Sequence, residues 1–581
     1  MDVRKLSLLI SLSAGICAII LTNLHRSWAV IPWLIGMVVW ALYFWSDHSE
    51  GSRLHSSRVP FAFGLAVFVL LAATVVRVYR LGDFPLGPNV DEIFTLNNSL
   101  ILLEKPFDLF GQTPLISEGW VETPNLYLYF NLLILKVAGV SYQSMKLLSV
   151  IPGVIACVGI FLIGHLMFER RVAFCIALLF AFAHWPVRLS RYGWDASFMV
   201  MTFAVALWLV LLAVQRGRSF YAYCSGLVAG LGLYSYIGSR ICLLSLLGFL
   251  LLEGINRRDR SIWKQGIAFA AGTAAVAFPL FCYYLLKPAA FWIRAKELSV
   301  FNSPDPFLAI VNNVFHHALM FHAIGGTFAR DNYPGLPALD PLTGILFIAG
   351  LAILIRHRDN AFARLLACTF LLNFAGGVLT VSQEGPPYVY RTVALMVPAF
   401  LIVGFGVRWL MSRTKVVTSF AILIATILNL YLYFGLEARN TAAMRVMGYE
   451  LRQVGQEIAE NDSPVFLVGW DLLSPMELHS KPNEKYASSN PVVVPPPIIQ
   501  RLAIINFSGR YDITRPVSEN LVHPKNIYFV RSLSPEVAPP VKIIFKRGNP
   551  EIDQMLVQRR ASTRELRNIL GEPLRTVATF F

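Results

Sequence analysis

The sequence has few charged residues. Of 581 residues, 15% are charged and 56% are hydrophobic, and the mean hydropathy is +0.57. Disordered chains are poor in hydrophobic residues, and soluble globular proteins carry about a quarter of charged residues. The composition therefore excludes a disordered or fibrous chain and indicates a polytopic membrane protein rather than a soluble enzyme.

Cysteine and nucleotide-binding motifs are also scarce or missing. The seven cysteines lie in apolar stretches, and none follows residue 368, so we expect neither a disulfide framework nor a cysteine-ligated zinc. The sequence has no phosphate-binding GxxxxGK loop, no dinucleotide fingerprint and no GxSxG motif. We therefore expect no nucleotide or redox cofactor.

What the chain has in abundance is apolar segments long enough to approach the thickness of a bilayer, which a helix of about 20 residues crosses. We predict about 13 transmembrane helices. They are Leu6–Thr22, Trp28–Trp45, Pro60–Tyr79, Leu147–Phe168, Val172–Pro186, Ala196–Val214, Phe220–Ile237, Ile241–Ile255, Gln265–Leu286, Leu342–Ile355, Ala361–Val381, Thr392–Met411 and Val416–Phe434.

The charges of the connecting loops predict an orientation. Lys and Arg exceed Asp and Glu by 50 to 35, and we attribute the net charge of +15 to cytoplasmic loops rather than to nucleic-acid binding. The short basic loops are 169–171, 216–218, 256–260, 356–358 and 413–415. We therefore expect a multi-pass protein of the plasma (inner) membrane with a cytoplasmic N-terminus and with loops 80–146 and 287–341 outside.

Three regions follow from this pattern. Residues 1–59 hold two leading transmembrane helices, residues 60–434 form the main membrane domain, and residues 435–581 form a small extracytoplasmic α/β domain. In this last region we expect a helix at Met444–Glu460 and short strands, separated by prolines, at Val465–Val468, Ala503–Phe507, Ile527–Val530, Val541–Phe545 and Thr576–Phe581. The apolar segment Leu126–Gly139 is too short to cross, and a crossing would turn every later basic loop outward. We expect it to lie along the outer surface, with a re-entrant helix as the alternative.

Carboxylates at a membrane boundary are costly unless they are solvated or functional. Asp91 and Glu92 follow a Pro/Gly-rich stretch in the first outer loop, and an acidic helix start is the alternative explanation. Asp195 lies at the outer mouth between two spans, where it could instead cap a helix. Glu122 precedes the surface segment, where it could be an ordinary solvated loop residue.

Arginines also occur at the predicted outer boundary, where short loops should be poor in them. A guanidinium can bind a lipid phosphate, although pairing with a carboxylate or snorkelling explains any single one. Tyr234 and Tyr236 are candidates for stacking on a sugar, or for interfacial anchoring. The candidate arginines are Arg188, Arg191, Arg240, Arg330 and Arg391.

A divalent metal site is a further possibility in the outer loops. His316, His317 and His322 lack the i, i+4 spacing of a helical metal site and are explained as well by polar loop residues. His317 with Glu122 or Asp195 is the ligand set that we consider.

The order of these features resembles the GT-C fold membrane glycosyltransferases that use polyprenyl phosphates, among them bacterial relatives of the protein O-mannosyltransferases and the lipid A aminoarabinose transferase. The resemblance covers roughly Pro60–Phe434 and rests on Asp91-Glu92, Glu122-Thr123-Pro124, Ser190–Asp195 and Leu233–Arg240 in this order. It extends to Arg330–Pro341 and to Glu384–Pro387 before Arg391. Thr123 departs from the aminoarabinose enzymes, which have a Lys there, and the two leading helices look like an addition.

The resemblance implies a transferase that moves a hexosyl or pentosyl group from a polyprenyl-phosphate donor at the outer face, with inversion. Asp91 would be the general base for an acceptor on a protein, lipid or glycan. Glu92, Glu122 and Asp195 would shape an acidic mouth or hold a metal. Arg191, Arg240 and Arg391 would neutralise the lipid phosphate.

Three other functions stay open at this point. A transporter or flippase for a lipid-linked glycan is one, although the ionisable residues cluster at the outer mouth rather than at mid-span. An enzyme that moves whole oligosaccharides is the second. A scaffold without activity is the third.

Overall fold

The structure is a computed structural model, and it describes most of the membrane region and three short C-terminal strands. The described residues are 10, 13–14, 17, 30–45, 63–85, 91–92, 95–96, 98–99, 116–117, 123–124, 126–139, 141–382, 384–437, 440, 527–530, 541–545 and 577–578.

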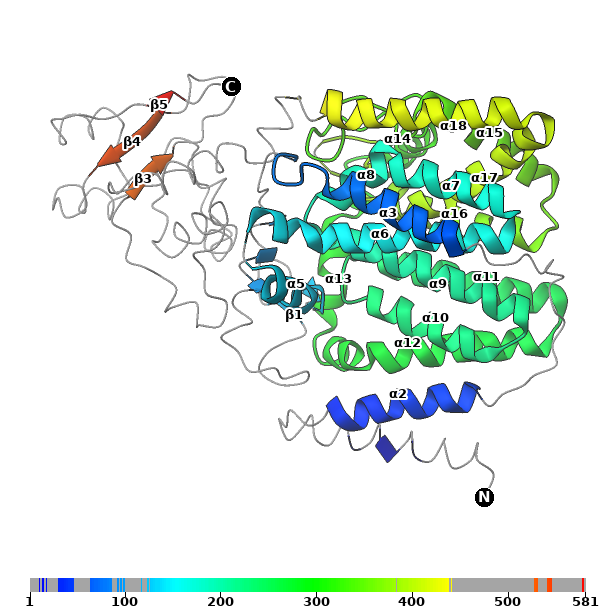
Figure 1. Cartoon of the computed structure of the whole chain (residues 1–581). Helices are drawn as coiled ribbons and strands as arrows, with labels where there is room; N and C mark the ends of the chain where they lie inside the picture. Colours follow the sequence, from blue (N-terminus) through cyan, green and yellow to red (C-terminus); the bar gives the residue numbers. More distant parts are fainter. Residues whose placement is uncertain are drawn as a thin grey trace.

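The described part of the chain is a bundle of roughly antiparallel helices (Figure 1). The helices are α2 (Val30–Trp45), α3 (Phe63–Val78), α5 (Leu126–Ala138), α6 (Tyr142–Met167), α7 (Arg170–Phe182), α8 (His184–Arg191), α9 (Ala196–Arg216), α10 (Ser219–Gly232), α11 (Ser239–Arg257), α12 (Arg260–Leu286), α13 (Pro288–Glu297), η2 (Val300–Asn302), α14 (Pro306–Leu319), α15 (Pro341–Arg356), α16 (Ala361–Val378), η3 (Val393–Leu395), α17 (Met396–Arg413), α18 (Lys415–Leu430) and η4 (Tyr431–Leu436).

The prediction of 13 spans is supported in part. Length and hydropathy identify seven helices among the described residues that could cross a membrane, or eight if the bent pair α7–α8 is one span. The helices α2, α3 and α15 coincide with other predicted spans but are shorter, with 16 residues each. The first predicted span, Leu6–Thr22, lies almost entirely outside the described residues.

Helix packing in the bundle depends on small residues. Gly226 of α10 and Gly272 of α12 lie where a Cβ atom would meet the backbone carbonyl of the facing helix, at Phe269 and Tyr223 respectively. The absence of a side chain lets the two backbones approach closely, which favours association of helices in a membrane. The chain bends by 55° between α7 and α8, where Pro186 occupies the first turn of α8 and needs no intrahelical donor.

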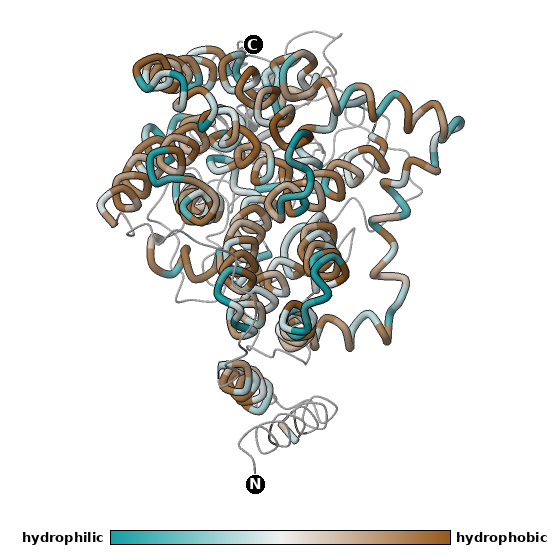
Figure 2. Tube along the Cα trace, turned by 90° about the vertical axis from the view of Figure 1, so that its right-hand side faces the viewer, coloured by the Kyte–Doolittle hydropathy of each residue, from teal (hydrophilic) through white to brown (hydrophobic). Residues whose placement is uncertain are grey.

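The helices alternate direction, so their connections divide between two ends. The basic turns that precede α7, α10, α12, α16 and α18 share one end, and α13, α14 and the turns before α9, α11 and α15 share the other. Figure 2 views the molecule from the basic end and shows hydrophilic connections between largely hydrophobic helices. The helix α5 lies across the opposite end, in agreement with a segment that does not cross (Figure 1).

The C-terminal strands β3 (Ile527–Val530), β4 (Val541–Phe545) and β5 (Val577–Ala578) form an antiparallel sheet in the order β3-β4-β5. They match three of the predicted strand segments. The predicted helix at 444–460 and the predicted strands at 465–468 and 503–507 lie outside the described residues. A second sheet pairs β1 (Ile116–Ser117) with β2 (Thr123–Pro124) near α5.

Candidate active site

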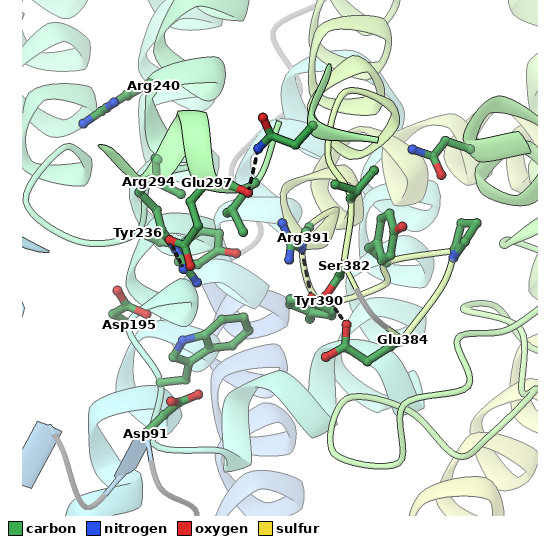
Figure 3. A pocket seen from close by; sticks show the side chains of 18 of the residues that line it. Asp91, Asp195, Tyr236, Arg240, Arg294, Glu297, Ser382, Glu384, Tyr390 and Arg391 are labelled. Atoms are coloured by element: carbon green, nitrogen blue, oxygen red, sulfur yellow. Dashed lines mark hydrogen bonds and ion pairs between the residues drawn. The ribbon is translucent and has the colours of Figure 1, made fainter. Parts of the chain in front are cut away.

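A cavity of about 1020 Å³ opens at the end of the bundle opposite the basic turns. Segments far apart in the chain line it, including the first outer loop, the turn before α9, the turn before α11, the region from α13 to α14 and the loop after α16. Predicted site residues that line it are Asp91, Asp195, Tyr236, Arg240, Arg330 and Arg391. Figure 3 shows Asp91 and Asp195 on one side, with Tyr390 and Arg391 facing them.

Asp91 is held at the cavity wall by two neighbours. Arg330 donates from Nη1 to Oδ2 of Asp91 at 3.2 Å, and the Tyr192 hydroxyl donates to the same oxygen at 3.3 Å. The side chain of Asp91 remains 42% exposed, against 18% for Arg330. One carboxylate oxygen is therefore oriented, while much of the group still faces the cavity.

Arg330 is itself fixed by a planar contact with its neighbour in sequence. Its Nε and Nη2 donate to the two carboxylate oxygens of Asp331 at 2.8 and 3.1 Å. Its guanidinium also lies over the rings of Phe328, Tyr390 and Trp194, at 5.0, 5.3 and 5.9 Å. Bidentate and stacked arginines hold one orientation well.

Asp195 precedes α9, but its side chain makes no capping hydrogen bond to that helix. Its Oδ1 is buried and has no hydrogen-bond partner among the described residues. Burial, and secondarily the charge of Asp91, raises the pKa of Asp195 to about 7. This carboxyl group can therefore be protonated near neutral pH, unlike an ordinary aspartate.

Arg391 lines the cavity, and one of its guanidinium nitrogens has no hydrogen-bond partner among the described residues. Its Nε donates to the Tyr390 hydroxyl at 2.9 Å, and its guanidinium lies 5.2 and 5.4 Å from the ring centres of Tyr390 and Tyr388. Its Nη1 is buried without a hydrogen-bond partner in the described part of the chain. The Tyr390 hydroxyl donates to Ser382, and Ser382 donates to Glu384 (Figure 3). These two contacts hold the Tyr390 hydroxyl in place.

Of the predicted site residues that the structure describes, Glu92, Arg188, Arg191, Tyr234 and His317 do not line the cavity. Glu92 is buried, pairs with Lys146 at 2.7 Å and accepts from the Gly193 amide at 2.8 Å. Arg191 is fully buried and donates to four backbone carbonyls, those of residues 76, 77, 80 and 84. Tyr234 is buried and donates to the Val276 carbonyl. These contacts attach turns at the cavity end to the bundle, so we assign Glu92, Arg191 and Tyr234 to the framework.

Arg240 lines the cavity but points away from the two carboxylates (Figure 3). Its Nη1 donates to the Phe291 carbonyl at 2.7 Å, and its guanidinium lies 4.0 Å from the centre of the Phe291 ring. This contact attaches α13 to the start of α11, which leaves Arg391 as the arginine better placed for a substrate anion.

The candidate metal ligands do not form a metal site in the described residues, where no three His, Cys, Asp or Glu side chains lie close enough to hold a metal. Both ring nitrogens of His317 are engaged, Nδ1 with the Asn313 carbonyl and Nε2 as acceptor from the Tyr388 amide. His317 therefore does not fit a ligand role, and Glu122 lies outside the described residues.

The structure also adds residues that the sequence did not suggest. Tyr192 contacts Asp91, and Tyr127 of α5, Arg294 and Glu297 of α13 line the cavity. Arg294 pairs with Glu297 at 2.6 Å. The sequence offered one signal for α13, a Pro start followed by charges at a spacing of three, which is also common on solvated helices.

Comparison with known proteins finds a family model that is similar to part of the chain. Residues 122–284 match the family model described as dolichyl-phosphate-mannose-protein mannosyltransferase. This segment includes Asp195, Tyr236 and Arg240, and the match confirms the resemblance drawn from the sequence. No curated protein sequence matches the chain.

Several solved structures are similar at low sequence identity. ArnT from Cupriavidus metallidurans in the apo state is 13% identical, with 82% of this chain and 94% of that chain covered and a TM-score of 0.48. The Archaeoglobus fulgidus oligosaccharyltransferase in the apo form is 12% identical, with 70% and 58% covered and a TM-score of 0.46. The S. cerevisiae protein O-mannosyltransferase Pmt1-Pmt2 complex bound to the sugar donor is 17% identical, with 39% and 34% covered and a TM-score of 0.31. The chain thus spans 58% of the archaeal protein.

Proposed function

From the family match of residues 122–284 and the cavity beside them, we propose that this chain transfers a sugar from a polyprenyl-phosphate donor to an acceptor at the outer face of the membrane. The transferred group is a hexose or a pentose, and its configuration inverts. The acceptor is a hydroxyl or amine of a protein, lipid or glycan.

One observation carries the proposal. Carboxylates and arginines from segments more than 290 residues apart meet in one cavity, at the end away from the basic turns. Ionisable groups at a membrane boundary are costly unless they are solvated or functional, and short basic loops mark the cytoplasmic side. A donor held in the outer leaflet could place its head group in this cavity while its tail stays in lipid.

Asp91 is the proposed general base. The acceptor hydroxyl gives its proton to a carboxylate oxygen of Asp91 as the acceptor oxygen attacks the anomeric carbon. The bond from that carbon to the phosphate oxygen breaks, and the phosphate leaves with the electron pair. The proton then passes from Asp91 to water, which restores the carboxylate. Such assistance is typically worth about 10²–10⁴ in rate.

Arg391 is the proposed partner of the leaving phosphate, because its Nη1 is buried without a hydrogen-bond partner among the described residues. Negative charge grows on the phosphate as the bond breaks, and a preorganised cation stabilises it most in a water-poor site. Arg330 is already committed to Asp91 and Asp331, so its proposed role is to orient the base.

The test is Asp91→Asn in the purified membrane protein with a panel of polyprenyl-phosphate sugars. We expect transfer to fall at least about 100-fold because the base is lost, with unchanged membrane insertion. Asp83→Asn is the matched control, since Asp83 is an exposed carboxylate paired with Arg80 and does not line the cavity. Activity of Asp91→Asn near that of the control would remove Asp91 from this role.

The products separate the remaining functions. Free lipid phosphate together with an acceptor heavier by one sugar supports the proposal. A mass increase of several sugars would instead identify an oligosaccharide transferase. Movement of the lipid-linked sugar without bond cleavage would identify a transporter.

A further inference from the structure

The outer end of α18 reaches into the framework behind the cavity. The helix continues through the π-helical turn η4 to Glu437, whose side chain is 3% exposed. The two carboxylate oxygens of Glu437 lie 3.3 Å from Nδ1 of His184 and 3.3 Å from Nη1 of Arg188. A carboxylate this deeply buried needs such cationic or polar partners.

Arg188 connects this carboxylate to the loop that carries Arg330. Its Nη2 donates to the carbonyl of Ala329 at 2.9 Å, directly before Arg330 in the chain. Burial raises the pKa of the neighbouring Asp331, and Arg330 and then Arg188 oppose that effect. Arg188 therefore acts on both the backbone and the electrostatics of this loop.

A second contact from α18 fixes the other end of the same loop. Asn429 donates to Asp340 at 2.7 Å and accepts from the His184 amide at 2.9 Å. Asp340 in turn caps α15 through the amides of residues 342 and 343. The segment 329–340 is thus held at its start through Glu437 and at its end through Asn429.

We propose that Glu437 and Asn429 are positioning residues that clamp the segment 329–340 and so hold Arg330 against Asp91. The inference rests on the proposed function for its effect on catalysis, but the clamp itself is a property of the fold. Neither residue lines the cavity, so both act through other side chains.

The clamp is expected to affect rate more than binding. Arg188 uses one guanidinium nitrogen for Glu437 and another for Ala329, so loss of the carboxylate charge frees Arg188 to reorient. A shift of about 1 Å in a catalytic constellation can cost about 10²-fold in rate. The donor phosphate is bound elsewhere, by Arg391, so its binding should change little.

The first experiment needs no substrate. Hydrogen exchange of the full-length protein in detergent is compared for wild type, Glu437→Gln and Glu253→Gln. Glu253 is an equally buried carboxylate that pairs with Arg257 and Arg364 on the other side of the bundle. We expect at least about fivefold faster exchange in peptides covering 326–336 for Glu437→Gln alone. Equal protection of those peptides in all three proteins would overturn the clamp.

The second experiment measures the coupling to catalysis. Glu437→Gln should lower kcat about tenfold with KM for the donor within twofold, and Glu437→Asp should recover part of the loss. In the Arg330→Gln background the same change should have little further effect, since contacting residues in one network are not additive. Full additivity, or a loss confined to KM, would overturn the positioning role. Absence of transfer by wild type would count against the proposed function and leave the exchange result standing.

Discussion

The two arginines that face Asp91 and Asp195 differ in their partners. Arg330 contacts the carboxylates of Asp91 and Asp331, whereas Arg391 contacts only hydroxyl and aromatic groups of its own loop in the described structure. A cation whose charge is not already compensated is the better site for an incoming anion. The proposed roles, base orientation for Arg330 and phosphate binding for Arg391, rest on this difference.

Arg391→Gln tests that division. Loss of one preorganised donor to developing charge costs about 10²–10³ in rate in other enzymes, so we expect kcat to fall by about 100-fold. Arg80→Gln is the control, because Arg80 is exposed at the same end of the bundle and lies outside the cavity. Steady-state transfer assays measure both, and equal activities would contradict the phosphate role.

Asp195 predicts a pH dependence of stability. Its pKa is about 7 in the folded protein, because of burial and the Asp91 charge, and is lower in the unfolded chain. Folding therefore favours the protonated form of Asp195, so the free energy of unfolding of the wild type decreases as pH rises from about 4 through 7. Asp195→Asn stays neutral, so the difference between its thermal unfolding midpoint and that of the wild type should increase between pH 5 and pH 8, in favour of the variant. A constant difference across that range would contradict the raised pKa.

At the scale of elements, hydrophobic length predicted most helices but not their breaks or the outer loops. The predicted span Val172–Pro186 is bent in the structure between α7 and α8, and α8 continues beyond Pro186 to Arg191. The loop 287–341 contains α13 and α14, which were not predicted. On α14 the exposed residues Phe307, Val311 and Phe315 share one face with a helical spacing, a signal that was present but was obscured by nearby polar residues.

Close packing of α10 against α12 predicts a position-specific effect of alanine. Gly226→Ala should place a methyl group against the Phe269 carbonyl and destabilise the bundle by about 1–3 kcal/mol, as overpacking does. Gly266→Ala on α12 should be neutral or slightly stabilising, because nothing lies within 4 Å of its Cβ position. Thermal unfolding in detergent compares the two, and equal midpoints would contradict this packing.

At the scale of the whole molecule, the sequence predicted which costly residues gather at one end but not which of their side chains face the cavity. Asp91, Asp195, Tyr236, Arg330 and Arg391 all line the cavity, as the order of outer segments suggested. Glu92 is adjacent to Asp91 but points into the bundle toward Lys146. The direction in which a side chain points from its helix decides whether the residue lines the cavity or packs in the framework. Hydropathy contains no information about that direction.

The distribution of charge between the two ends predicts an orientation. His322 lies near the cavity end and His357 lies in a basic turn, and both side chains are exposed. In a protein whose native cysteines are replaced, His322→Cys should react with a membrane-impermeant maleimide in intact cells. His357→Cys in a basic turn should react only after permeabilisation. The reverse pattern would place the cavity on the cytoplasmic side and contradict the proposed donor.

The location of the cavity at the very end of the bundle has an energetic consequence. In the proposed function, the head group of the donor enters this cavity from the side of the membrane to which the cavity opens. Transfer of that head group across the bilayer would then be a separate step that precedes catalysis, and its rate would limit turnover whenever it is the slower of the two.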